Sequence, residues 1–410
     1  MSIAKLKQEV LDPALCAGCG ACGLVCPKQL IRFDKDRITP VLDFHTDACA
    51  TCDAPCHAVC PGADPATDAS EEQLFGRRRT VDERWLGIIG SVLGASSTSE
   101  EIRSRSASGG AATALLLESR RYLDVKHVLS MGRDAAEGWR AAPVVSNETA
   151  RIIGNAQSTY QMAPYLVALR TVYEATPDDN VAVVGLACHI QALRKLQRLD
   201  SALGQWARER IVLLIETACS SNTLPAGTSG IVSDVLRLKL DEVVDVKYRE
   251  GSYPGNFQTR TRDGRAHVVQ FWEILGKLKE NKTHRCLTCG DWMSGLADIS
   301  VSDGDPNIFD ASVNGATVAK HARLIVRTPL GGALIEHAVE QGALERWAID
   351  MSGFNLGLER KRNRRRHYEL SVLPIPKGPG AGDAFDRDSL RSDDELINPA
   401  TYKRRHNDPV

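Results

Sequence analysis

The sequence predicts a multidomain α+β/α/β protein, in which a small cysteine-rich module precedes a larger mixed α/β domain with a parallel βαβ core. Three observations lead to this class. The chain has 410 residues, enough for two or three domains. Eight of its 12 cysteines fall within the first sixty residues. Two apolar, β-branched runs, 181–186 and 211–215, flank a helical stretch over 191–199, which predicts two parallel strands joined by a helix.

Cysteine spacing near the N-terminus gives the strongest functional signal. Residues 16–27 have the spacing C-x2-C-x2-C-x3-C-P, and residues 49–61 have C-x2-C-x3-C-x3-C-P. The first spacing is that of bacterial ferredoxins, in which three thiolates bind one 4Fe-4S cluster and the fourth binds its neighbour. Two such runs predict a pair of clusters. By this crossing rule, the first quartet is Cys16, Cys19, Cys22 and Cys60, and the second quartet is Cys49, Cys52, Cys56 and Cys26.

Two other uses of these cysteines remain as alternatives. Structural zinc accepts four thiolates, although it usually takes them from two separated pairs. A disulfide framework suits a small secreted domain, whereas this chain is long and its N-terminus lacks the apolar core of a signal peptide. We therefore expect residues 1–62 to form a bacterial-ferredoxin-like 2x(4Fe-4S) module, with short strands near 31–33 and 38–41, in a cytoplasmic protein.

Overall composition excludes two classes of partner. The chain has 51 Lys and Arg residues against 52 Asp and Glu residues, so its net charge gives no general attraction to nucleic acid or to a membrane surface. Aromatic residues make up only 5% of the chain, too few to suggest a stacking platform for single-stranded nucleic acid. No apolar run reaches the roughly 18 residues that span a bilayer. We expect no nucleic-acid partner and no membrane span.

The four cysteines outside this module predict a third cluster. Cys188 and Cys219 each follow an apolar run, so both lie just past the carboxyl end of a candidate strand, where open α/β sheets bind ligands. The other two form a C-x2-C pair among polar neighbours. Four thiolates are what a further 4Fe-4S cluster requires, and the alternative is that Cys188 and Cys219 are buried as small apolar residues. The third quartet is Cys188, Cys219, Cys286 and Cys289.

A helix start near residue 110 is a candidate anion site. The run 111–117 is rich in helix formers, and small residues and arginines precede it. The free N–H groups of such a helix start attract phosphate, so a flavin pyrophosphate would fit. An ordinary Ser-capped helix is the alternative. Neither a G-x-G-x-x-G motif after a strand nor a phosphate-binding P-loop occurs in the chain.

The remaining elements complete the expected layout. The chain should contain a strand over 125–131, a polar turn from 154, a hairpin over 257–269, a strand after 297, and helices near 318 and 334–341. We expect residues 63–100 to be a linker, residues 101–355 to form the domain that contains the candidate anion site and the third cluster, and residues 356–410 to be a charged, loosely ordered tail. Its basic run 360–366 is either a solvated surface or a site for an acidic substrate or partner.

Four segments carry a family resemblance. They are S-A-S-G-G-A-A-T-A-L-L at 106–116, G-N-A-Q-S-T-Y-Q-M-A-P at 154–164, V-A-V-V-G-L-A-C-H-I-Q-A-L-R at 181–194, and C-L-T-C-G-D-W followed by A-D-I-S-V-S-D-G-D within 286–305. Together they resemble the coenzyme F420 (deazaflavin) hydrogenase/dehydrogenase beta subunits. The similarity extends over roughly residues 85–330, behind the ferredoxin-like module.

The resemblance implies FAD bound beside a 4Fe-4S cluster. Members of this family include subunits that pass electrons to deazaflavin and ferredoxin-dependent reductases of tetrapyrroles. We therefore expect three 4Fe-4S clusters and FAD, and we place the flavin at the helix start and at nearby polar turns. The flavin residues would be Arg105, Ser106, Ser108, Gly109, Gly110, Gln157, Ser158, Tyr160 and Asn222.

These expectations combine into a hypothesis of an FAD- and iron-sulfur-dependent oxidoreductase. Ferredoxin or another redox protein would supply single electrons, the clusters would carry them to FAD, and a hydride would pass to an organic substrate or a deazaflavin coenzyme. His189 or Tyr160 would donate the proton, although a structural role for His189 is the alternative. The competing hypothesis is an electron-transfer subunit of a larger dehydrogenase or hydrogenase complex without its own organic substrate. A homo-oligomer and a complex subunit both stay open.

Overall fold

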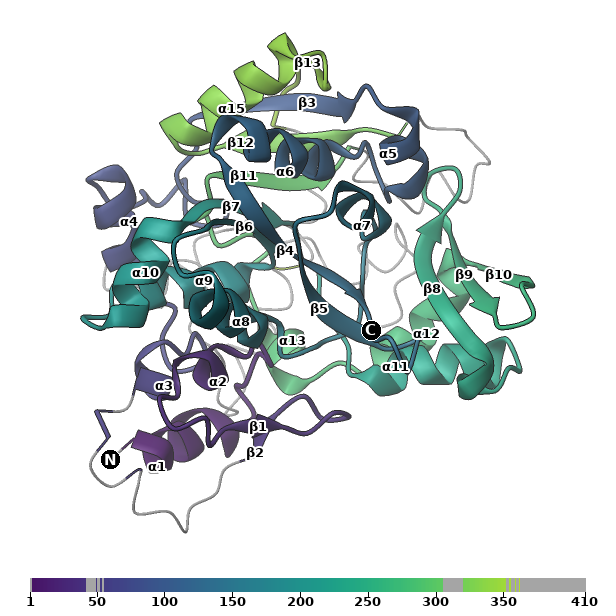
Figure 1. Ribbon diagram of the computed structural model, residues 1–410, viewed down its shortest axis with the longest axis horizontal. Coiled ribbons are helices and arrows are strands. Elements are labelled where there is room, and N and C mark those ends of the chain that lie inside the picture. The colour runs from purple at the N-terminus through teal and green to yellow at the C-terminus, as the bar shows by residue number, and fades with distance from the viewer. Residues whose placement is uncertain are drawn as a thin grey trace.

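The computed structural model describes residues 2–41, 49, 52, 53, 55–304, 320–351, 354, 358 and 361. A large mixed sheet crosses the molecule, with the N-terminal module at the lower left of the view and a small three-stranded sheet at the right (Figure 1). The helix expected near residue 318 and most of the expected tail lie outside the described residues.

The N-terminal module consists of short helices and a small hairpin. Its elements are α1 (Ser2–Leu6), the π-helix η1 (Lys7–Leu11), α2 (Ala21–Val25), β1 (Arg32–Phe33), β2 (Pro40–Val41) and α3 (Pro55–Ala58). β1 and β2 pair antiparallel, which confirms the two short strands expected between the cysteine runs. Leu6, Val10 and Val59 are fully buried among them.

The large sheet has eight strands within the described ranges. They are β3 (Ser91–Ser97), β4 (Val125–Arg133), β5 (Ala141–Ser146), β6 (Asn180–Gly185), β7 (Ile211–Thr217), β11 (Ile299–Asp303), β12 (Ala322–Val326) and β13 (Leu344–Ala348). Their order is β13-β3-β12-β11-β7-β6-β4-β5. The four central strands β11, β7, β6 and β4 run parallel, and antiparallel strands complete both sides. The mixed α/β class with a parallel βαβ core is therefore confirmed.

The βαβ unit sets the position of Cys188. β6 and β7 are parallel, as predicted from their apolar runs, and α9 (Ala187–Gln197) and α10 (Ala202–Arg210) connect them. The helix begins at residue 187, four residues earlier than the stretch predicted from residue 191. Leu186 is the N-cap residue of α9, and its N–H donates to Nδ1 of His189 at 3.2 Å. Cys188 consequently lies in the first turn of the helix, directly at the carboxyl end of β6.

Residues 91–97 differ from the expectation of a linker over 63–100. They form β3, which pairs with both β12 and β13 and is an interior strand of the sheet. The strand reads S-V-L-G-A-S-S, with few of the β-branched and aromatic residues that usually signal a strand. Gly94 faces the indole of Trp347, where a Cβ would lie 2.3 Å from Nε1, so tertiary packing determines this strand. α4 (Thr67–Phe75) also lies within the expected linker.

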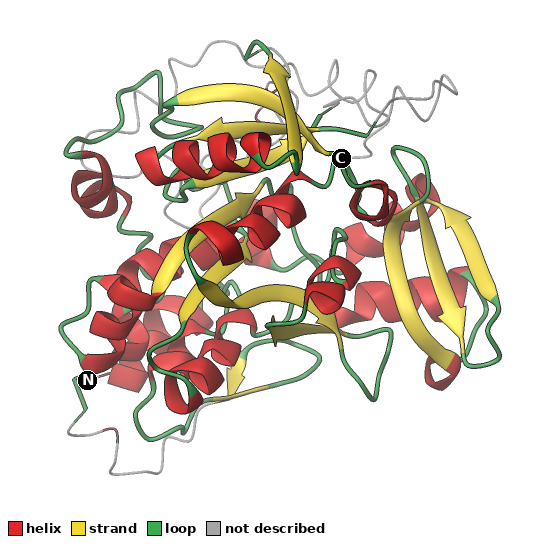
Figure 2. Cartoon of the chain, turned by 45° about the horizontal axis from the view of Figure 1, so that its top comes forward, coloured by secondary structure: helices red, strands yellow, loops and turns green. Residues whose placement is uncertain are grey.

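Helices cover both faces of the sheet (Figure 2). α6 (Ala111–Tyr122) and α15 (Pro329–Glu340) share one apolar core with the strands. On the other face, η3 (Tyr165–Ala168), α8 (Leu169–Ala175), α9 and α10 share a second core with the N-terminal module. The module is thus continuous with the main domain through its buried side chains. α5 (Glu100–Arg105) and α7 (Thr149–Gly154) are short helices near the start of α6.

The small sheet is an antiparallel meander with its own core. It comprises β8 (Val243–Glu250), β9 (Asn256–Thr261) and β10 (Ala266–Gln270), in the order β10-β9-β8. The pairing of β9 with β10 confirms the predicted hairpin. The nearby helical elements are α11 (Pro225–Gly230), η4 (Ile231–Val235), η5 (Leu240–Glu242), η6 (Phe271–Ile274), α12 (Leu275–Glu280) and α13 (His284–Thr288).

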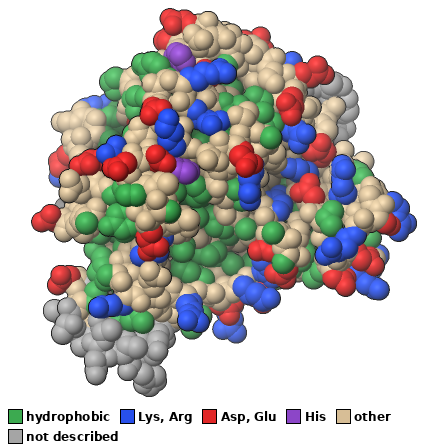
Figure 3. Space-filling view, in the orientation of Figure 1, with side chains coloured by type: hydrophobic (Ala, Val, Ile, Leu, Met, Phe, Trp, Pro, Cys, Tyr) green, Lys and Arg blue, Asp and Glu red, His purple; other side chains and the backbone are tan. Residues whose placement is uncertain are grey.

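The surface agrees with the balanced composition. Figure 3 shows Lys and Arg side chains interspersed with Asp and Glu on the face of Figure 1, so neither sign of charge dominates this face. None of the helices in the described ranges combines the length and the apolar character that a bilayer span would require.

Candidate functional site

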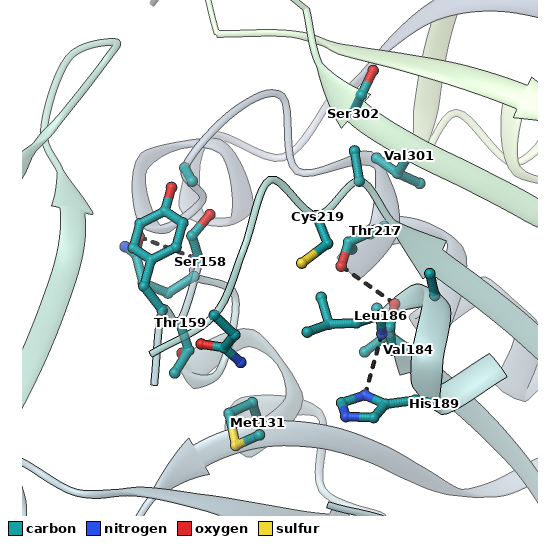
Figure 4. Close-up of a pocket in the computed structure, with 18 of the residues that line it drawn as sticks. Met131, Ser158, Thr159, Val184, Leu186, His189, Thr217, Cys219, Val301 and Ser302 are labelled. Carbon is teal, nitrogen blue, oxygen red and sulfur yellow. Dashed lines mark hydrogen bonds between the residues drawn. The ribbon is translucent and has the colours of Figure 1, made fainter. Parts of the chain in front are cut away.

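A cavity of about 370 Å³ opens at the carboxyl ends of β6 and β7. Its wall combines the start of α6, the turn at 154–163, the loops after β6 and β7, α13 with the residues that follow it, and the end of β11. Figure 4 shows side chains from the turn at 154–163, from the ends of β6 and β7 with the residues that follow them, and from β11 around one open space. The position matches the general rule that open α/β sheets bind ligands at this edge, and the volume lies within the range of cofactor pockets.

Most residues predicted to bind the flavin line this cavity. They are Ser106, Ser108, Gly110, Gln157, Ser158, Tyr160 and Asn222. Arg105 and Gly109 are not among the lining residues. The Arg105 side chain is half exposed and lies 3.7 Å from the Glu101 carboxylate, whereas Gly109 packs against β12, where a Cβ would lie 2.6 Å from the Cα of His321. These two residues therefore lie outside the cavity wall.

The start of α6 is open to an anionic ligand. Gly110 is the N-cap residue with φ +74°, and no side chain caps the helix there. Ser106, which could have been the cap, instead donates its hydroxyl hydrogen to the carbonyl of Ile102 at 2.7 Å. The helix is 12 residues long and its first turn has no acidic residue. Its free N–H groups and positive dipole end favour a phosphate group at this edge of the cavity.

Hydrogen bonds hold the turn before α6 in place. The Lys320 ammonium donates to the carbonyl oxygens of Arg103, Ser104 and Ser106, at 3.3, 3.2 and 2.7 Å. Gln157 donates its Nε2 hydrogen to the carbonyl of Arg105 at 3.1 Å. The polar turn at 154–163 and the helix start are therefore fixed to each other across the cavity wall.

All four cysteines of the third quartet line the cavity. Cys188 and Cys219 come from the ends of β6 and β7, and Cys286 and Cys289 come from α13 and its C-cap. Burial raises the pKa of the Cys188 thiol well above its usual 9.0, and the neighbouring thiols of Cys19, Cys219 and Cys286 raise it further. In Figure 4 the Cys219 sulfur points into the open space. The structure thus brings together the four cysteines that the sequence grouped by count.

The N–H donors around the third quartet fit an iron-sulfur cluster. Arg285 is buried in the cavity wall, and its Nη1 and Nη2 have no hydrogen-bond partner among the described residues. The N–H of Asp291 donates to Sγ of Cys289 at 3.4 Å. Clusters are held by thiolates and stabilised by N–H groups directed at sulfur, so these donors suit that ligand. Within the described residues, no group of three or more His, Cys, Asp and Glu side chains is arranged to hold a single metal ion.

The first quartet comes together inside the module. Burial, together with the nearby Cys60 thiol, raises the pKa of the Cys16 and Cys19 thiols from 9.0 to about 12. Burial also raises the pKa of Cys22 well above 9.0, and the thiols of Cys19, Cys16 and Cys60 add to this effect. The N–H of Gly18 donates to Sγ of Cys16 at 3.4 Å. The four cysteines that the crossing rule assigns to the first quartet thus lie near one another, and Cys56 of the second quartet also lies near Cys22.

The second quartet shows the same crossed arrangement. Burial, together with the nearby thiols of Cys52, Cys26 and Cys49, raises the pKa of the Cys56 thiol to about 11. Cys26, the last cysteine of the first run, therefore lies with the second run. The N–H of Leu30 donates to Sγ of Cys26 at 3.4 Å.

The first quartet lies next to the third. Cys19 is among the thiols that raise the pKa of Cys188, and Cys286 is among those that raise the pKa of Cys16. This proximity depends on how the cysteine module packs against the main domain. The N–H of Leu166, in η3, donates to the carbonyl of Cys19 at 2.8 Å, and the buried Lys195 ammonium donates to the carbonyl of Cys60 at 2.9 Å. The cysteine module is thereby fixed against the helices that cover the sheet.

The two proposed proton donors have different surroundings. His189 is buried, stacks on Tyr165 with ring centroids 4.6 Å apart, and accepts the N–H of Leu186 at the start of α9. Burial lowers the pKa of His189 to about 3, so the imidazole is neutral at pH 7 and its geometry favours the structural role. Burial raises the pKa of Tyr160, whose hydroxyl lies beside Arg249 and Ser158 in the cavity wall. Tyr160 is therefore the better placed of the two.

Three models of known families match the chain. The model of the coenzyme F420 hydrogenase/dehydrogenase beta subunit N-terminus matches residues 92–170, and that of the C-terminus matches residues 178–351. Together they cover more than half of the chain. The chain belongs to the coenzyme F420 hydrogenase/dehydrogenase beta-subunit family. A 4Fe-4S dicluster domain matches residues 15–63, the span of the first two cysteine runs.

Individual relatives agree with this family. The chain is 27% identical to the coenzyme F420 hydrogenase subunit beta of Methanococcus voltae, over 71% of this chain and 99% of that protein. It is 26% identical to a subunit of the F(420)H(2) dehydrogenase of Methanosarcina mazei, over 88% of this chain and 94% of that protein. A chain of the F420-reducing [NiFe] hydrogenase complex from Methanosarcina barkeri has a similar fold, with a TM-score of 0.55 and 22% identity, over 69% of this chain and 90% of that one.

Several cavity residues of this family member were not predicted from its sequence. Arg249 is fully buried on β8, and its Nη1 donates to both oxygens of Asp303 at 2.9 and 2.8 Å. Asp291 accepts a hydrogen bond from Gln191 at 2.9 Å, and both side chains are buried. Lys361, from the expected tail, is also buried and lines the cavity. The polar neighbours of the C-x2-C pair could have indicated Asp291, but no motif marks Arg249.

Proposed function

We propose that this chain is an electron-transfer subunit of a deazaflavin-linked hydrogenase or dehydrogenase complex, with three 4Fe-4S clusters and FAD as its bound groups. The named relatives support this class, since they are subunits of F420 hydrogenases and of an F(420)H(2) dehydrogenase. The observation that carries the proposal is the proximity of Cys19 to Cys188. It joins a cysteine module to the wall of a cofactor-sized cavity within one chain.

The residues that would hold these groups follow from the site. The first and second quartets would each hold one cluster in the module, and the third quartet would hold one in the cavity wall. The start of α6 at Gly110 would bind the flavin pyrophosphate, since its N–H groups face the cavity without a capping side chain. When bound, the clusters carry single electrons and the flavin exchanges one or two, so the set connects a one-electron donor to a hydride carrier.

The chain's own side chains would prepare the cavity for this chemistry. Burial raises the pKa of the Cys188 thiol, and Arg285 supplies positive charge beside Cys188, Cys286 and Cys289. Arg249 is held by Asp303 and by the carbonyl of Pro254, which accepts from its Nε at 2.7 Å. This leaves the Arg249 guanidinium beside the Tyr160 hydroxyl, where it stabilises negative charge on the phenolic oxygen when a proton is passed on.

A second candidate is a reductase complete in one chain, with ferredoxin as donor and a small molecule as acceptor. It is favoured by the polar wall opposite α6, where Tyr160 and Arg249 line the cavity. An electron-transfer subunit needs no proton donor for an organic substrate of its own. The second candidate therefore predicts turnover of a substrate by the isolated chain.

Metal and flavin content test the proposal directly. Protein purified without oxygen should contain about twelve iron atoms per chain and one FAD, as three 4Fe-4S clusters require. About eight iron atoms per chain or fewer, or no flavin, would overturn it. Anaerobic titration of the bound flavin with reduced deazaflavin, reduced ferredoxin and NADH should then show reduction by deazaflavin. Reduction by ferredoxin alone, with turnover of a substrate by the isolated chain, would favour the second candidate.

A further inference from the structure

Arg285 is a buried cation for which the described residues offer no hydrogen-bond acceptor at its outer nitrogens. It lies in α13, one residue before Cys286, and only 2% of its surface is exposed. Its Nη1 and Nη2 have no partner among the residues that the structure describes, and its side chain lines the cavity. Burying a guanidinium without compensating charges or hydrogen bonds costs free energy. The groups near Arg285 should therefore explain why it is buried.

Cysteines of two different quartets surround this guanidinium. On the cavity side, Cys188, Cys286 and Cys289 lie within its electrostatic reach, together with the Asp291 carboxylate. From the module, Cys16 of the first quartet also lies within its reach. The Asp291 carboxylate accepts from Gln191 at one oxygen and also balances part of the charge of Arg285, while the cysteine sulfurs are further acceptors near its outer nitrogens. Arg285 thus lies near cysteines of both quartets.

We propose that Arg285 is a positioning residue that sets the reduction potential of the third cluster above that of the first. The proposal rests on the proposed function, because it requires clusters at both quartets. A positive charge and N–H···S hydrogen bonds stabilise the more negative, reduced state of an iron-sulfur cluster and so raise its potential. The largest effects of thiols on Arg285 come from three cysteines of the third quartet, whereas Cys16 of the first quartet feels it more weakly than it feels Cys60, so the third cluster should receive the larger effect.

The consequence is a favoured direction of electron movement within the chain. The electron lost at the first quartet is the electron gained at the third, so the step needs no proton and no further reactant. Arginine suits this place because its guanidinium stays charged when buried and presents several N–H groups in a plane. A lysine would keep the charge, but its compact ammonium would reach fewer sulfur atoms.

Redox titration of variants tests this role. In the full-length protein, purified without oxygen, the spectrum of each cluster would be followed by electron paramagnetic resonance against applied potential. At the wild-type midpoint potential of the third cluster, Arg285→Gln should lower its ratio of reduced to oxidised form about tenfold, which corresponds to about 59 mV for a one-electron couple. The first cluster should shift less, and the second should not shift. Arg285→Lys, which keeps the charge, should shift the third cluster by less than tenfold.

Controls separate this role from loss of the fold or of a cluster. Arg327→Gln is the matched control, because Arg327 is also buried but lies near Glu216, Arg79 and Glu71 rather than near cysteines. It should leave the third cluster's potential unchanged. Iron content would be measured first in every variant. If Arg285→Gln does not retain the third cluster, the test uses Arg285→Lys. A change of tenfold or more in the ratio of reduced to oxidised third cluster in Arg285→Lys, despite the retained charge, would overturn the proposal.

Failure of the role proposed for Arg285 can be distinguished from failure of the proposed function. An unchanged potential in Arg285→Gln, with its iron content intact, overturns the role of Arg285 and leaves the proposed function standing. A wild-type protein without a third cluster overturns the proposed function itself, whatever the variants show. An equal shift of the third cluster in Arg327→Gln would also overturn the role, since any buried arginine would then have the same effect.

Discussion

Gly20 offers a direct test of how the cysteine module docks on the main domain. Its φ is +85°, and a Cβ built there would lie 2.7 Å from the carbonyl carbon of Pro164 and 2.8 Å from its oxygen. These are backbone atoms, so rotation of a side chain cannot relieve the overlap. Gly20 is also the N-cap residue of α2, which carries Cys22. Gly20→Ala should therefore push the first quartet away from the turn before η3.

The expected loss of stability has two parts. A left-handed backbone costs an alanine roughly 1–2 kcal/mol relative to glycine, and overpacking against fixed atoms costs about 1–3 kcal/mol. Gly20→Ala should therefore lower the free energy of unfolding by about 2–5 kcal/mol, the sum of the two parts. Gly76→Ala isolates the first part, because Gly76 has φ +68° and no heavy atom of the described residues would lie within 4 Å of a Cβ at this position.

Urea unfolding of both variants and of the wild type, prepared without oxygen, measures the difference. Gly76→Ala should lose only the backbone part and keep the wild-type iron content. Gly20→Ala should lose more stability and also bind less iron, since the overlap displaces residues of the first quartet. Equal free energies of unfolding for the two variants would refute the reasoning, because they would show that Pro164 does not restrain the module.

Three further changes test the cavity and a surface ion pair. Gly110→Ala should distort the start of α6, because Gly110 has φ +74° and a Cβ would lie 2.7 Å from Cγ2 of Ile102. The variant should therefore retain less flavin on gel filtration. An unchanged flavin-to-protein ratio would contradict the anion site. Tyr160→Phe should reduce hydride turnover by about 10²–10⁴-fold with the flavin content intact, if Tyr160 donates the proton, and unchanged turnover would exclude it. The Arg77 guanidinium lowers the pKa of Glu83 from 4.5 to about 2, so the stability from this pair is complete above pH 4.5 and is lost as the pH falls toward 2. Glu83→Gln should flatten that part of the unfolding profile of the metal-free chain, and an unchanged slope would contradict this assignment.

The predictable parts of the fold are those with a strong local pattern. The strands at 181–186 and 211–215 are continuous apolar runs, which in a parallel sheet are buried on both faces. The hairpin at 257–269 has Asp263-Gly264 at its turn, and Gly264 has φ +83° in the structure. The position of a ligand site could also be predicted from these two strands, because residues after neighbouring parallel strands meet at one edge of the sheet.

Other features depend on partners that are distant in the chain. β3 is poor in strand-forming residues, and its place follows from antiparallel pairing with β12 and β13, more than 200 residues away. Arg249 lies on a strand of the small sheet and reaches the cavity only because that sheet packs beside the domain. No local spacing marks such a residue, and its ion pair with Asp303 joins segments 54 residues apart.

The spatial order of the quartets also depends on contacts between segments that are distant in the chain. Spacing groups the cysteines into sets of four, but it cannot say which set lies nearest the cavity. That order depends on docking contacts, such as the hydrogen bond from Leu166 to Cys19 and those from Lys195 to Cys60 and Asp64. Because these donors bind backbone carbonyls of the module, their effect is insensitive to the side chains that they meet. The proximity of Cys19 to Cys188, on which the proposed electron transfer depends, is therefore a property of the packed structure rather than of the cysteine motifs.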